Sequence, residues 1–235
     1  MSASLAESGA DVRGMFDRVA RRYDAANRVM SAGVDVIWRK QAIGRLLARL
    51  GDEPLILDLG AGTLDGALEI VRRAPASRVA AADFSREMLR AGRRKLGRVA
   101  TAVDTHGADG HHLPYRDAAF DGAFSAFCVR NLADLPRGLA ELRRVVRPGG
   151  RVVILEFFRP ERPRFFFDRV YNAHVLPLIG WVVTGDRAAY QYLPASIARF
   201  RSRAEFAALL RAAGFADVDA RPLFPSGVAS LVVAS

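Results

Sequence analysis

The stretch LILDLGAGTLD, residues 55–65, decides the fold of this chain. It joins a short apolar run to a Gly-x-Gly turn, and a helical pattern begins at Asp65. The run is too short for a helix and is typical of a buried strand in a parallel sheet. Gly60 and Gly62 permit a sharp turn and let a ligand approach the backbone where a Cβ atom would collide with it. The helix that follows turns its free N–H groups toward that ligand, so the stretch predicts a strand, a binding turn and a helix.

A second apolar run, Val79 to Ala82, ends at Asp83, about 20 residues after Gly62. An acidic residue at the end of the second strand is placed to accept hydrogen bonds from ribose hydroxyls. The two strands therefore predict a nucleoside-binding pocket at the switch point of a doubly wound sheet.

The cofactor that these residues favour is S-adenosylmethionine rather than a dinucleotide. The dinucleotide motif G-x-G-x-x-G has a third glycine where this chain has Asp65, and a carboxylate there would repel a pyrophosphate. Asp58, on the strand itself, suits the cationic amino-acid part of S-adenosylmethionine. The alternative is a glycine turn that only closes a strand–helix junction, and the spacing of Asp58 and Asp83 makes it the less favoured interpretation.

Seven runs of the chain have the length and composition of strands. They are residues 55–59, 79–83, 99–103, 120–127, 151–157, 218–222 and 228–234. Helical patterns separate most of them, which predicts one α/β domain over residues 13–235 with a doubly wound, seven-stranded, mostly parallel sheet. Ser85 and Ser202 are predicted helix N-caps, with Glu205 three residues after Ser202. Residues 1–12 are small and polar and are predicted to be disordered.

The chain has 235 residues and a formal net charge of +10. Such a charge favours anionic lipid surfaces or nucleic acid, but the basic residues are spread along the chain, which is more typical of a solvated basic surface. Cys128 is the only cysteine and excludes an internal disulfide. The N-terminus lacks the apolar segment of a signal peptide, and no run of about 18 apolar residues could span a membrane. We therefore expect a cytoplasmic location.

Residues 13–50 have helical spacing and precede the first strand, so they could cover the cofactor pocket as a helical lid. Tyr23 would then supply a hydroxyl at the site; the alternative is that Tyr23 only packs this helical segment on the sheet. Further along, Asp109 and Gly110 lie where the loops after the third strand approach the adenine of a bound nucleoside. His111 and His112 are adjacent, which is poor geometry for two ligands of one metal, so no metal site is predicted.

Arg130 and Asn131 follow the predicted central strand, residues 120–127. Polar residues beyond the carboxyl end of a central strand are where this architecture places its chemistry, so these two are the leading candidates for contact with a substrate. The alternative is a surface loop that ends in a helix cap.

Residues 158–200 interrupt the alternation of strands and helices with an aromatic-rich insertion after the fifth strand. Its position suits a cover over a hydrophobic acceptor, and its mixture of basic and aromatic residues suits a membrane interface. The alternative is that the aromatic side chains form a satellite core.

With these motifs the chain resembles the class I methyltransferases that C-methylate the ring in menaquinone and ubiquinone biosynthesis. The resemblance extends from about Met15 to the C-terminus, and the two stretches inside the insertion are the most specific. The segments that carry it are FDRVA (16–20), YD (23–24), DLGAGTLD (58–65), DFS (83–85), ML (88–89), LP (113–114), FD (120–121), VRN (129–131), PGG (148–150), LEF (155–157), HVLP (174–177), YQYLP (190–194) and SI (196–197).

The resemblance implies a Rossmann-like fold and a methyl transfer from S-adenosylmethionine to the ring of a prenylated quinol. The residues that it implies for the cofactor are Asp58, Gly60, Gly62, Thr63, Asp83, Phe84, Asp109, Gly110 and Ala126. The residues that we expect at the acceptor are Arg130, to stabilise a phenolate or hold a water, His174, as a proton acceptor, and Tyr23 and Asn131, to orient the ring. The family usually has Gly at the positions of Leu64 and Cys128 and Ser at that of Ala126, and Leu64 is expected to crowd the methionine side.

Several choices stay open from the sequence. The acceptor could be a naphthoquinol (demethylmenaquinol) or a benzoquinol, and the chain could form a homodimer or contact the inner face of the membrane peripherally. The rival classes are a methyltransferase acting on RNA or another small molecule, and a non-catalytic cofactor-binding scaffold. The chain lacks the Asn/Asp-Pro-Pro-aromatic motif of amino-methylating enzymes, so nucleic acid is not the expected partner.

Overall fold

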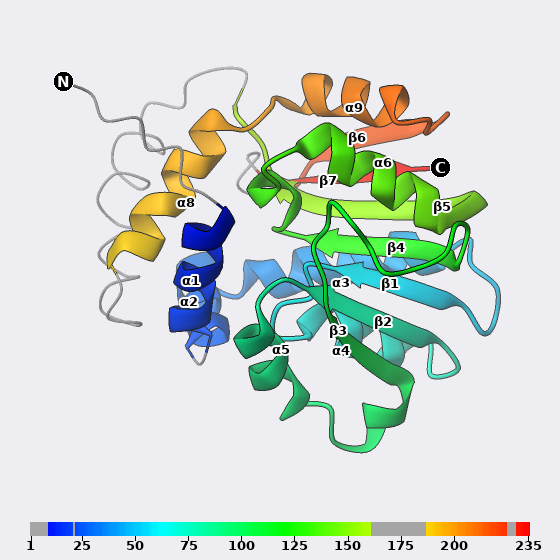
Figure 1. Cartoon of the computed structure of the whole chain (residues 1–235), viewed down its shortest axis with the longest axis horizontal. Coiled ribbons are helices and arrows are strands. Elements are labelled where there is room, and N and C mark those ends of the chain that lie inside the picture. Colours follow the sequence, from blue (N-terminus) through cyan, green and yellow to red (C-terminus); the bar gives the residue numbers. More distant parts are fainter. Residues whose placement is uncertain (1–8, 21, 161–186, 225–228) are drawn as a thin grey trace.

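The computed structural model describes residues 9–20, 22–160, 187–224 and 229–235 of the chain. Their centre is a seven-stranded sheet in the order β3-β2-β1-β4-β5-β7-β6 (Figure 1). The strands are β1 (Leu55–Leu59), β2 (Arg78–Asp83), β3 (Val103–Gly107), β4 (Phe120–Ala126), β5 (Val146–Phe157), β6 (Val218–Pro222) and β7 (Ala229–Ala234). Strand β7 runs antiparallel to both of its neighbours, and the other pairs are parallel. The predicted doubly wound, mostly parallel sheet is confirmed.

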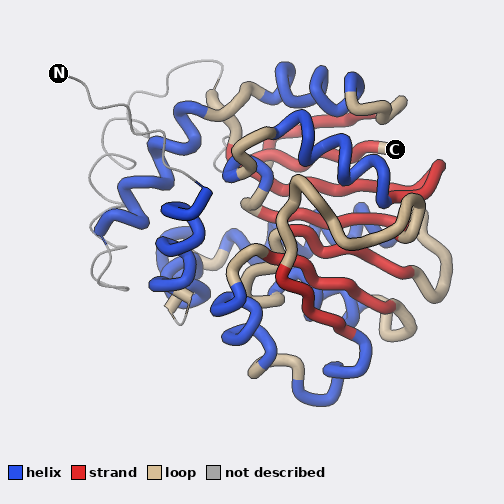
Figure 2. The backbone as a smooth tube through the Cα atoms, viewed as in Figure 1, coloured by secondary structure: helices blue, strands red, loops and turns tan. Residues whose placement is uncertain are grey.

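Helices cover both faces of this sheet (Figure 2). They are α1 (Gly9–Val19), α2 (Tyr23–Ser31), α3 (Val34–Leu47), α4 (Asp65–Arg73), α5 (Arg86–Arg93), α6 (Leu135–Val145), α8 (Arg187–Arg199) and α9 (Arg203–Ala212), with 3-10 turns η1 (Gly97–Ala102) and η2 (Val129–Asn131). Helices α3, α4 and α5 pack on one face, and α6 and α9 pack on the other. Because both faces are covered, the strands are apolar on both sides rather than alternating.

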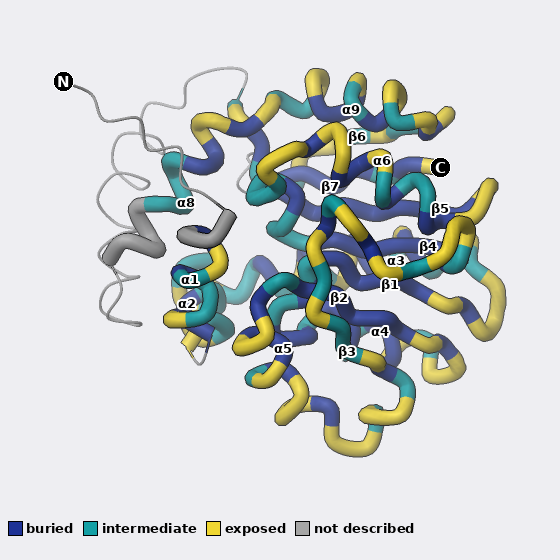
Figure 3. The backbone as a smooth tube through the Cα atoms, viewed as in Figure 1, coloured by how far each residue is buried: buried dark blue, intermediate teal, exposed yellow. Residues whose placement is uncertain are grey.

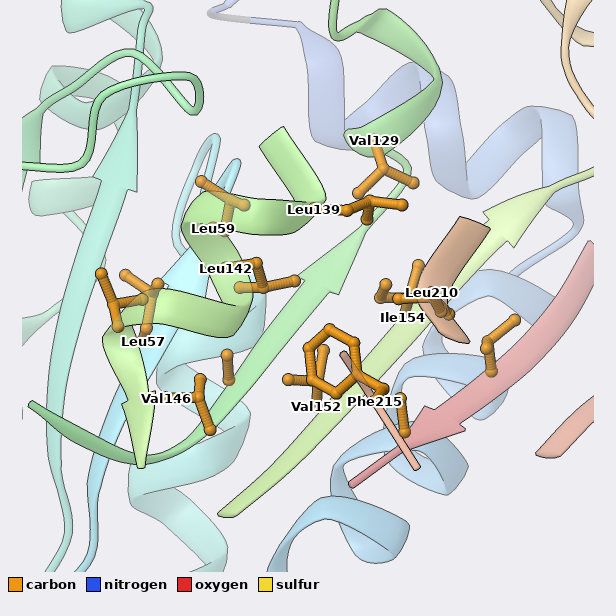
Figure 4. Packing of buried hydrophobic residues seen from close by; sticks show 14 of the residues in the cluster. Leu57, Leu59, Val129, Leu139, Leu142, Val146, Val152, Ile154, Leu210 and Phe215 are labelled. Atoms are coloured by element: carbon orange, nitrogen blue, oxygen red, sulfur yellow. The ribbon is translucent and has the colours of Figure 1, made fainter. Parts of the chain in front are cut away.

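Strand β1 shows how this double burial arises. Leu57 and Leu59 are buried toward α6 and α9, whereas Ile56 is buried toward α3 and α4. Figure 4 shows the first of these two cores, where Leu57 and Leu59 lie beside Leu139 and Leu142 of α6. The central strands are dark blue in Figure 3, while exposed residues gather on the outer faces of the helices and in the loops.

The predicted helix caps are confirmed. The Ser85 hydroxyl accepts a hydrogen bond from the Met88 N–H at the start of α5. At the start of α9, Ser202 and Glu205 form a capping box, in which each side chain accepts a bond from the other residue's N–H. These caps are local interactions, which is why the sequence reveals them.

Three predicted boundaries are wrong. Residues 9–12 begin helix α1 and are not disordered, whereas residues 1–8 lie outside the described part. The third strand is Val103–Gly107 and not 99–103, because residues 97–102 form η1 and the polar run that follows pairs with β2 at the half-exposed edge of the sheet. The fifth strand begins at Val146, with a register irregularity against β4 before Arg151.

Residues 13–50 were expected to cover the cofactor pocket as a helical lid, but only part of this segment lies at the pocket. Helix α3 packs on the sheet, where Trp38, Ile43 and Leu46 are buried among the strands. Helices α1 and α2 instead stand beyond the end of the sheet beside α8 (Figure 1), and Met15, Val19 and Ala26 form a small apolar cluster there. Most of the insertion, residues 161–186, lies outside the described part of the chain. None of the helices in the described ranges is long and apolar enough to cross a bilayer.

Leu64 lies in the core and not in the cofactor site, so the expectation that it crowds the methionine is wrong. It adopts φ +66°, and its side chain is fully buried among the residues between the sheet and helices α3 and α4. A Cβ atom on Gly92 would meet Leu64 Cγ at 2.5 Å, so the glycine leaves the space that the leucine fills. A left-handed conformation is unfavourable for leucine by roughly 1–2 kcal/mol, and burial of the side chain offsets it.

We expect Leu64→Ala to lower the free energy of unfolding by about 2–5 kcal/mol because it leaves a cavity. Leu64→Gly should be no less stable than Leu64→Ala, because glycine relieves the positive φ. The matched pair is Ile70→Ala and Ile70→Gly in α4, where glycine should be worse by about 1 kcal/mol. Urea unfolding measures all four variants. If the glycine variant is less stable than the alanine variant by as much at position 64 as at position 70, this account is contradicted.

Candidate functional site

A cavity of about 470 Å³ opens at the carboxyl ends of β1, β2 and β4, between the sheet and helices α1 and α2. This volume lies in the range of sites for small ligands. Residues that line it are Arg13, Phe16, Tyr23, Leu59, Gly60, Gly62, Ala82, Asp83, Phe84, Met88, Ala108, Asp109, Gly110, His111, Ala126, Phe127, Cys128, Asn131, Leu132 and Ala133. The cavity thus brings together residues from most of the length of the chain, at the predicted switch point between β1 and β4.

The glycine turn after β1 forms the floor of this cavity. Gly60 has φ +71°, and a Cβ atom on it would collide with the side chain of Cys128 from the loop after β4. The turn can therefore lie close to that loop only as glycine. Burial raises the pKa of the Cys128 thiol, so this side chain is a neutral part of the wall at neutral pH and not a nucleophile.

Asp83 at the end of β2 braces the turn. Its Oδ2 accepts a hydrogen bond from the Gly62 N–H at 2.8 Å, and its Oδ1 accepts one from the Ser85 N–H at 2.8 Å. Burial raises the pKa of Asp83 to about 6, although both N–H groups oppose the shift. Each carboxylate oxygen has further lone pairs with which it can accept a bond from a ribose hydroxyl.

A small recess of about 40 Å³ adjoins the cavity and shares Tyr23, Gly60 and Gly62 with it. Asp58 lies there, and its Oδ2 is buried without a hydrogen-bond partner among the described residues. Burial raises the pKa of Asp58 to about 7, against the opposing effects of Arg39 and of the Ala67 N–H. A buried carboxylate oxygen with no partner suits a ligand that brings its own positive charge, as the ammonium group of S-adenosylmethionine does.

The opposite end of the cavity has the residues expected around an adenine. Phe84 and Met88 provide apolar contact area, and Gly110 lies so close to Leu132 that a Cβ atom would meet the leucine at 2.9 Å. The Asp109 carboxylate already has hydrogen-bond partners in the protein, because its Oδ1 accepts bonds from the backbone N–H and the ring of His111. The cavity, the recess and these groups together fit S-adenosylmethionine; when it is bound, Asp83 would face the ribose and Asp58 the amino-acid part.

Tyr23 and Asn131 also line this cavity. The Tyr192 hydroxyl of α8 donates a hydrogen bond to Asn131 Oδ1 at 2.9 Å, which fixes the orientation of the amide. Burial raises the pKa of Tyr23, while its bond to Asn27 and the charge of Arg130 oppose the shift. Both residues therefore present neutral polar groups to the cavity.

Arg130 does not line the cavity. Its Nη1 forms an ion pair with Glu156 Oε1 at 2.6 Å and donates to the Phe127 carbonyl at 3.0 Å, and its Nε lies 3.3 Å from Ser196 Oγ. The side chain of Arg130 is 6% exposed and that of Glu156 is 0% exposed. Arg130 is therefore not on a surface loop, and it does not contact the cavity directly. It lies behind the residues that line the cavity, where the Glu156 carboxylate balances its charge.

Most of the predicted site residues meet around the cavity and its recess. Gly60, Gly62, Asp83, Phe84, Asp109, Gly110 and Ala126 line the cavity, and Asp58 and Thr63 line the recess. His174 lies outside the described residues. Within the described ranges, no group of three or more His, Cys, Asp or Glu side chains is arranged to hold a metal ion.

Sequence reasoning missed several residues of the site. Phe16 and Arg13 of α1 line the cavity, and Phe16 lies in the segment FDRVA whose apolar spacing could have indicated it. Arg39 of α3 lines the recess near Asp58, and nothing in its local sequence distinguishes it from the other arginines. Glu156 enters the sequence analysis only as part of the segment LEF (155–157), because its pairing with Arg130 joins two separate segments of the chain.

Comparison with known proteins shows the family of the chain. A family model described as the ubiE/COQ5 methyltransferase family matches residues 4–234. A protein of Deinococcus radiodurans named demethylmenaquinone methyltransferase is 42% identical over 210 residues, which are 89% of this chain and 86% of that protein. A protein of Paracoccus denitrificans named ubiquinone/menaquinone biosynthesis C-methyltransferase UbiE is 40% identical over 224 residues, 94% of this chain and 88% of that one.

Among solved structures, a SAM-dependent methyltransferase of Thermotoga maritima, titled as a possible histamine N-methyltransferase, resembles the chain with a TM-score of 0.64. The likeness covers 94% of this chain and 98% of that structure at 20% identity. At that identity it shows the fold alone, and the predicted Rossmann-like class is confirmed.

We expect Arg130→Met to lower the free energy of unfolding by about 3–5 kcal/mol, because it leaves the Glu156 carboxylate buried without its counter-charge. The double variant Arg130→Met/Glu156→Gln should recover most of that loss, because the amide carries no charge. Urea unfolding compares both with the parent protein. Equal stability of the single and double variants would show that the ion pair does not hold this wall together.

We also expect the affinity for S-adenosylmethionine to rise with pH. Asp58 is protonated in the free protein below a pKa of about 7, and the ligand's ammonium group favours the ionised form, so binding releases a proton at lower pH. Calorimetry should show about tenfold tighter binding at pH 7 than at pH 5.5.

Two controls isolate the contribution of Asp58. Asp58→Asn should remove this part of the pH dependence. 5′-Methylthioadenosine, which has the ribose but no amino-acid part, should show only the weaker dependence due to Asp83. An equal pH dependence for both ligands would assign the titration to Asp83 and refute the role given to Asp58.

Proposed function

Since the chain belongs to the ubiE/COQ5 methyltransferase family, we propose that it moves a methyl group from S-adenosylmethionine to a ring carbon of a prenylated quinol. It is an S-adenosylmethionine-dependent methyltransferase of quinone biosynthesis, like the relatives that match it over most of their length. The observation that carries the proposal within the structure is the cavity with a carboxylate recess at one end and an acceptor side of aromatic and neutral polar residues.

The cofactor, when bound, supplies a methyl carbon attached to a positively charged sulfur. A quinol ring becomes a good carbon nucleophile when a hydroxyl proton leaves, and the carbon that gains the methyl group then loses its own hydrogen as a proton. The protein must therefore hold a flat aromatic ring, exclude water and accept a proton. Positioning two reactants in this way can contribute up to ~7–11 kcal/mol.

Tyr23 and Asn131 are the residues that we assign to orienting the ring. Both line the cavity, and Asn131 is held from behind by Tyr192, so its amide presents a fixed group to the acceptor. Phe127, which stacks on Phe157 with ring centroids 4.7 Å apart, gives the acceptor side an apolar wall. Such a wall excludes water from the reacting carbon.

Arg130 would favour ionisation of the quinol through its charge from behind the wall. Its effect is moderated by Glu156, and arginine stays protonated, so it cannot accept the proton itself. His174, in the part of the chain outside the described residues, is proposed as the acceptor because an imidazole titrates near neutral pH. A prenylated acceptor also implies peripheral contact with a membrane, which we include in the proposal.

One of the two observations that would favour a non-catalytic cofactor-binding scaffold does not apply in the structure. Leu64 and Ala126 are the two departures from the family pattern that would favour such a scaffold, and Leu64 is buried in the core away from the cavity. Ala126 does line the cavity, where it gives up a hydroxyl but adds no bulk.

The test is methyl transfer by the purified protein from labelled S-adenosylmethionine to short-tail demethylmenaquinol, to a benzoquinol precursor and to total RNA. We expect a ring-methylated product by mass spectrometry from a quinol in its reduced form, and none from RNA. Transfer to RNA alone, or to no acceptor despite cofactor binding, would refute the proposal.

Asn131→Ala should lower kcat about 10- to 100-fold, because a poorly oriented ring reacts slowly. The dissociation constant of S-adenosylmethionine should stay within about threefold, which calorimetry checks. Tyr192→Phe is the matched control: it removes the hydrogen bond to Asn131 and keeps the amide, so its loss should be smaller. If kcat of Asn131→Ala stays within about threefold of the parent's value, the amide does not orient the ring.

A further inference from the structure

A second hollow lies on the other side of the cavity wall, between α8, η2 and the start of α6. It has a volume of about 560 Å³, and we call it the arginine pocket. Its polar lining residues are Arg130, Asp134, Tyr192, Ser196, Arg199 and Arg201. It shares Leu132 and Ala133 with the cofactor cavity, so residues 132–133 separate the two hollows.

The arginine pocket contains guanidinium groups that could bind a ligand, one of them buried and two at the surface. Arg130 lines it with a side chain that is 94% buried, and among the described residues this guanidinium bonds through Nε and Nη1 but not through Nη2. Arg199 at the end of α8 and Arg201 just beyond it are exposed, and neither guanidinium forms an ion pair with any residue in the described ranges. An anion in this pocket would thus meet one buried and two exposed guanidinium groups.

The charges of the lining favour a ligand with a single negative charge. Glu156 balances Arg130, and the carboxylate of Asp134, which accepts the Arg137 N–H at the start of α6, offsets one of the two exposed arginines. One positive charge is left over. Inorganic phosphate and phosphomonoesters carry about 1.5 to 2 negative charges at pH 7, whereas a phosphodiester carries one.

The arginine pocket is also connected to the acceptor side of the cofactor cavity. Ser196 of α8 accepts a bond from Arg130 Nε, and Tyr192 of α8 donates to Asn131, which lines the cavity. A ligand held at Arg199 and Arg201 would therefore lie at the C-terminal end of the helix that orients the acceptor-side amide.

We propose that the arginine pocket binds the phosphodiester of a phospholipid head group and so seats the protein on the membrane from which it takes its acceptor. This inference rests on the proposed function, because a prenylated quinol dissolves in lipid and must be collected there. Guanidinium groups bind phosphate oxygens with paired hydrogen bonds, which Arg199 and Arg201 can supply, while Arg130 can add a single bond from Nη2.

The experiment is co-sedimentation of the full chain with vesicles of phosphatidylglycerol and phosphatidylcholine (30:70) and with vesicles of phosphatidylcholine alone. The pocket variant is Arg199→Ala/Arg201→Ala. The matched control is Arg94→Ala/Arg98→Ala, which removes the same charge from exposed residues after α5 and in η1, at the β3 end of the sheet. All four residues are exposed, and thermal melting checks that each variant folds as the parent does.

We expect the parent to bind the phosphatidylglycerol vesicles and the pocket variant to bind them about tenfold or more weakly, while the control changes less than about threefold. Soluble glycerophosphoglycerol should displace the parent from the vesicles more effectively than inorganic phosphate at equal concentration. Equal losses in the two variants would show general surface charge and overturn the proposal, and so would an absence of vesicle binding. Better displacement by inorganic phosphate would assign the pocket to a free phosphate and also overturn it.

Methyl transfer to a short-tail quinol in vesicle-free buffer separates this inference from the proposed function. The pocket variant should retain the parent's rate within about twofold. If the parent binds vesicles through the arginine pocket but methylates no quinol, the lipid site stands and the proposed function fails. If the parent methylates the quinol and the pocket variant binds vesicles as well as the parent does, the proposed function stands and the lipid site fails.

Discussion

The Asp83 carboxylate is the interaction on which the rest of the site depends. It accepts the N–H of Gly62 from the turn after β1 and the N–H of Ser85 from the start of α5, so one side chain joins two strand–helix units. The carbonyl of Ala82 adds bonds from the N–H groups of Gly60 and Ala61. Because the turn is anchored to the neighbouring strand at these points by bonds within the protein, a ligand meets a backbone that is already held in place, which lowers the cost of ordering it on binding.

The N-terminal helices are tied to this turn by charged groups and not by apolar packing alone. Asp24 of α2 accepts a bond from the Thr63 hydroxyl, and Lys95 pairs with both Asp24 and Asp65. Burial opposes ionisation of Asp65, but Lys95, Arg39 and Arg28 together lower its pKa. The carboxylate that replaces the third glycine of a dinucleotide motif is therefore a cross-link between the recess and its cover.

The Arg130–Glu156 pair has the same role on the acceptor side. It joins η2 to the end of β5, and through Ser196 it also holds α8, so three segments meet at one buried guanidinium. A buried pair of this kind contributes little net stability compared with apolar residues, but loss of one partner is expensive in free energy. It therefore fixes where Asn131 stands relative to the cavity, and it leaves one face of Arg130 toward the arginine pocket.

The sequence by itself determined the parallel sheet, the glycine turn, the capped helices α5 and α9, and the class of cofactor. These follow from interactions between residues close in the chain: the apolar runs of β1 and β2, the φ of Gly60, and the side chain of Ser202 on its own helix. Only the tertiary structure decided that Leu64 belongs to the core, that Arg130 stands behind the cavity wall, and that Arg39 reaches the recess. Each of these depends on partners far away in the sequence, namely Gly92, Glu156 and Asp58. A local pattern specifies the conformation of its own segment, whereas the direction and charge state of a buried side chain are set by whatever the fold packs against it.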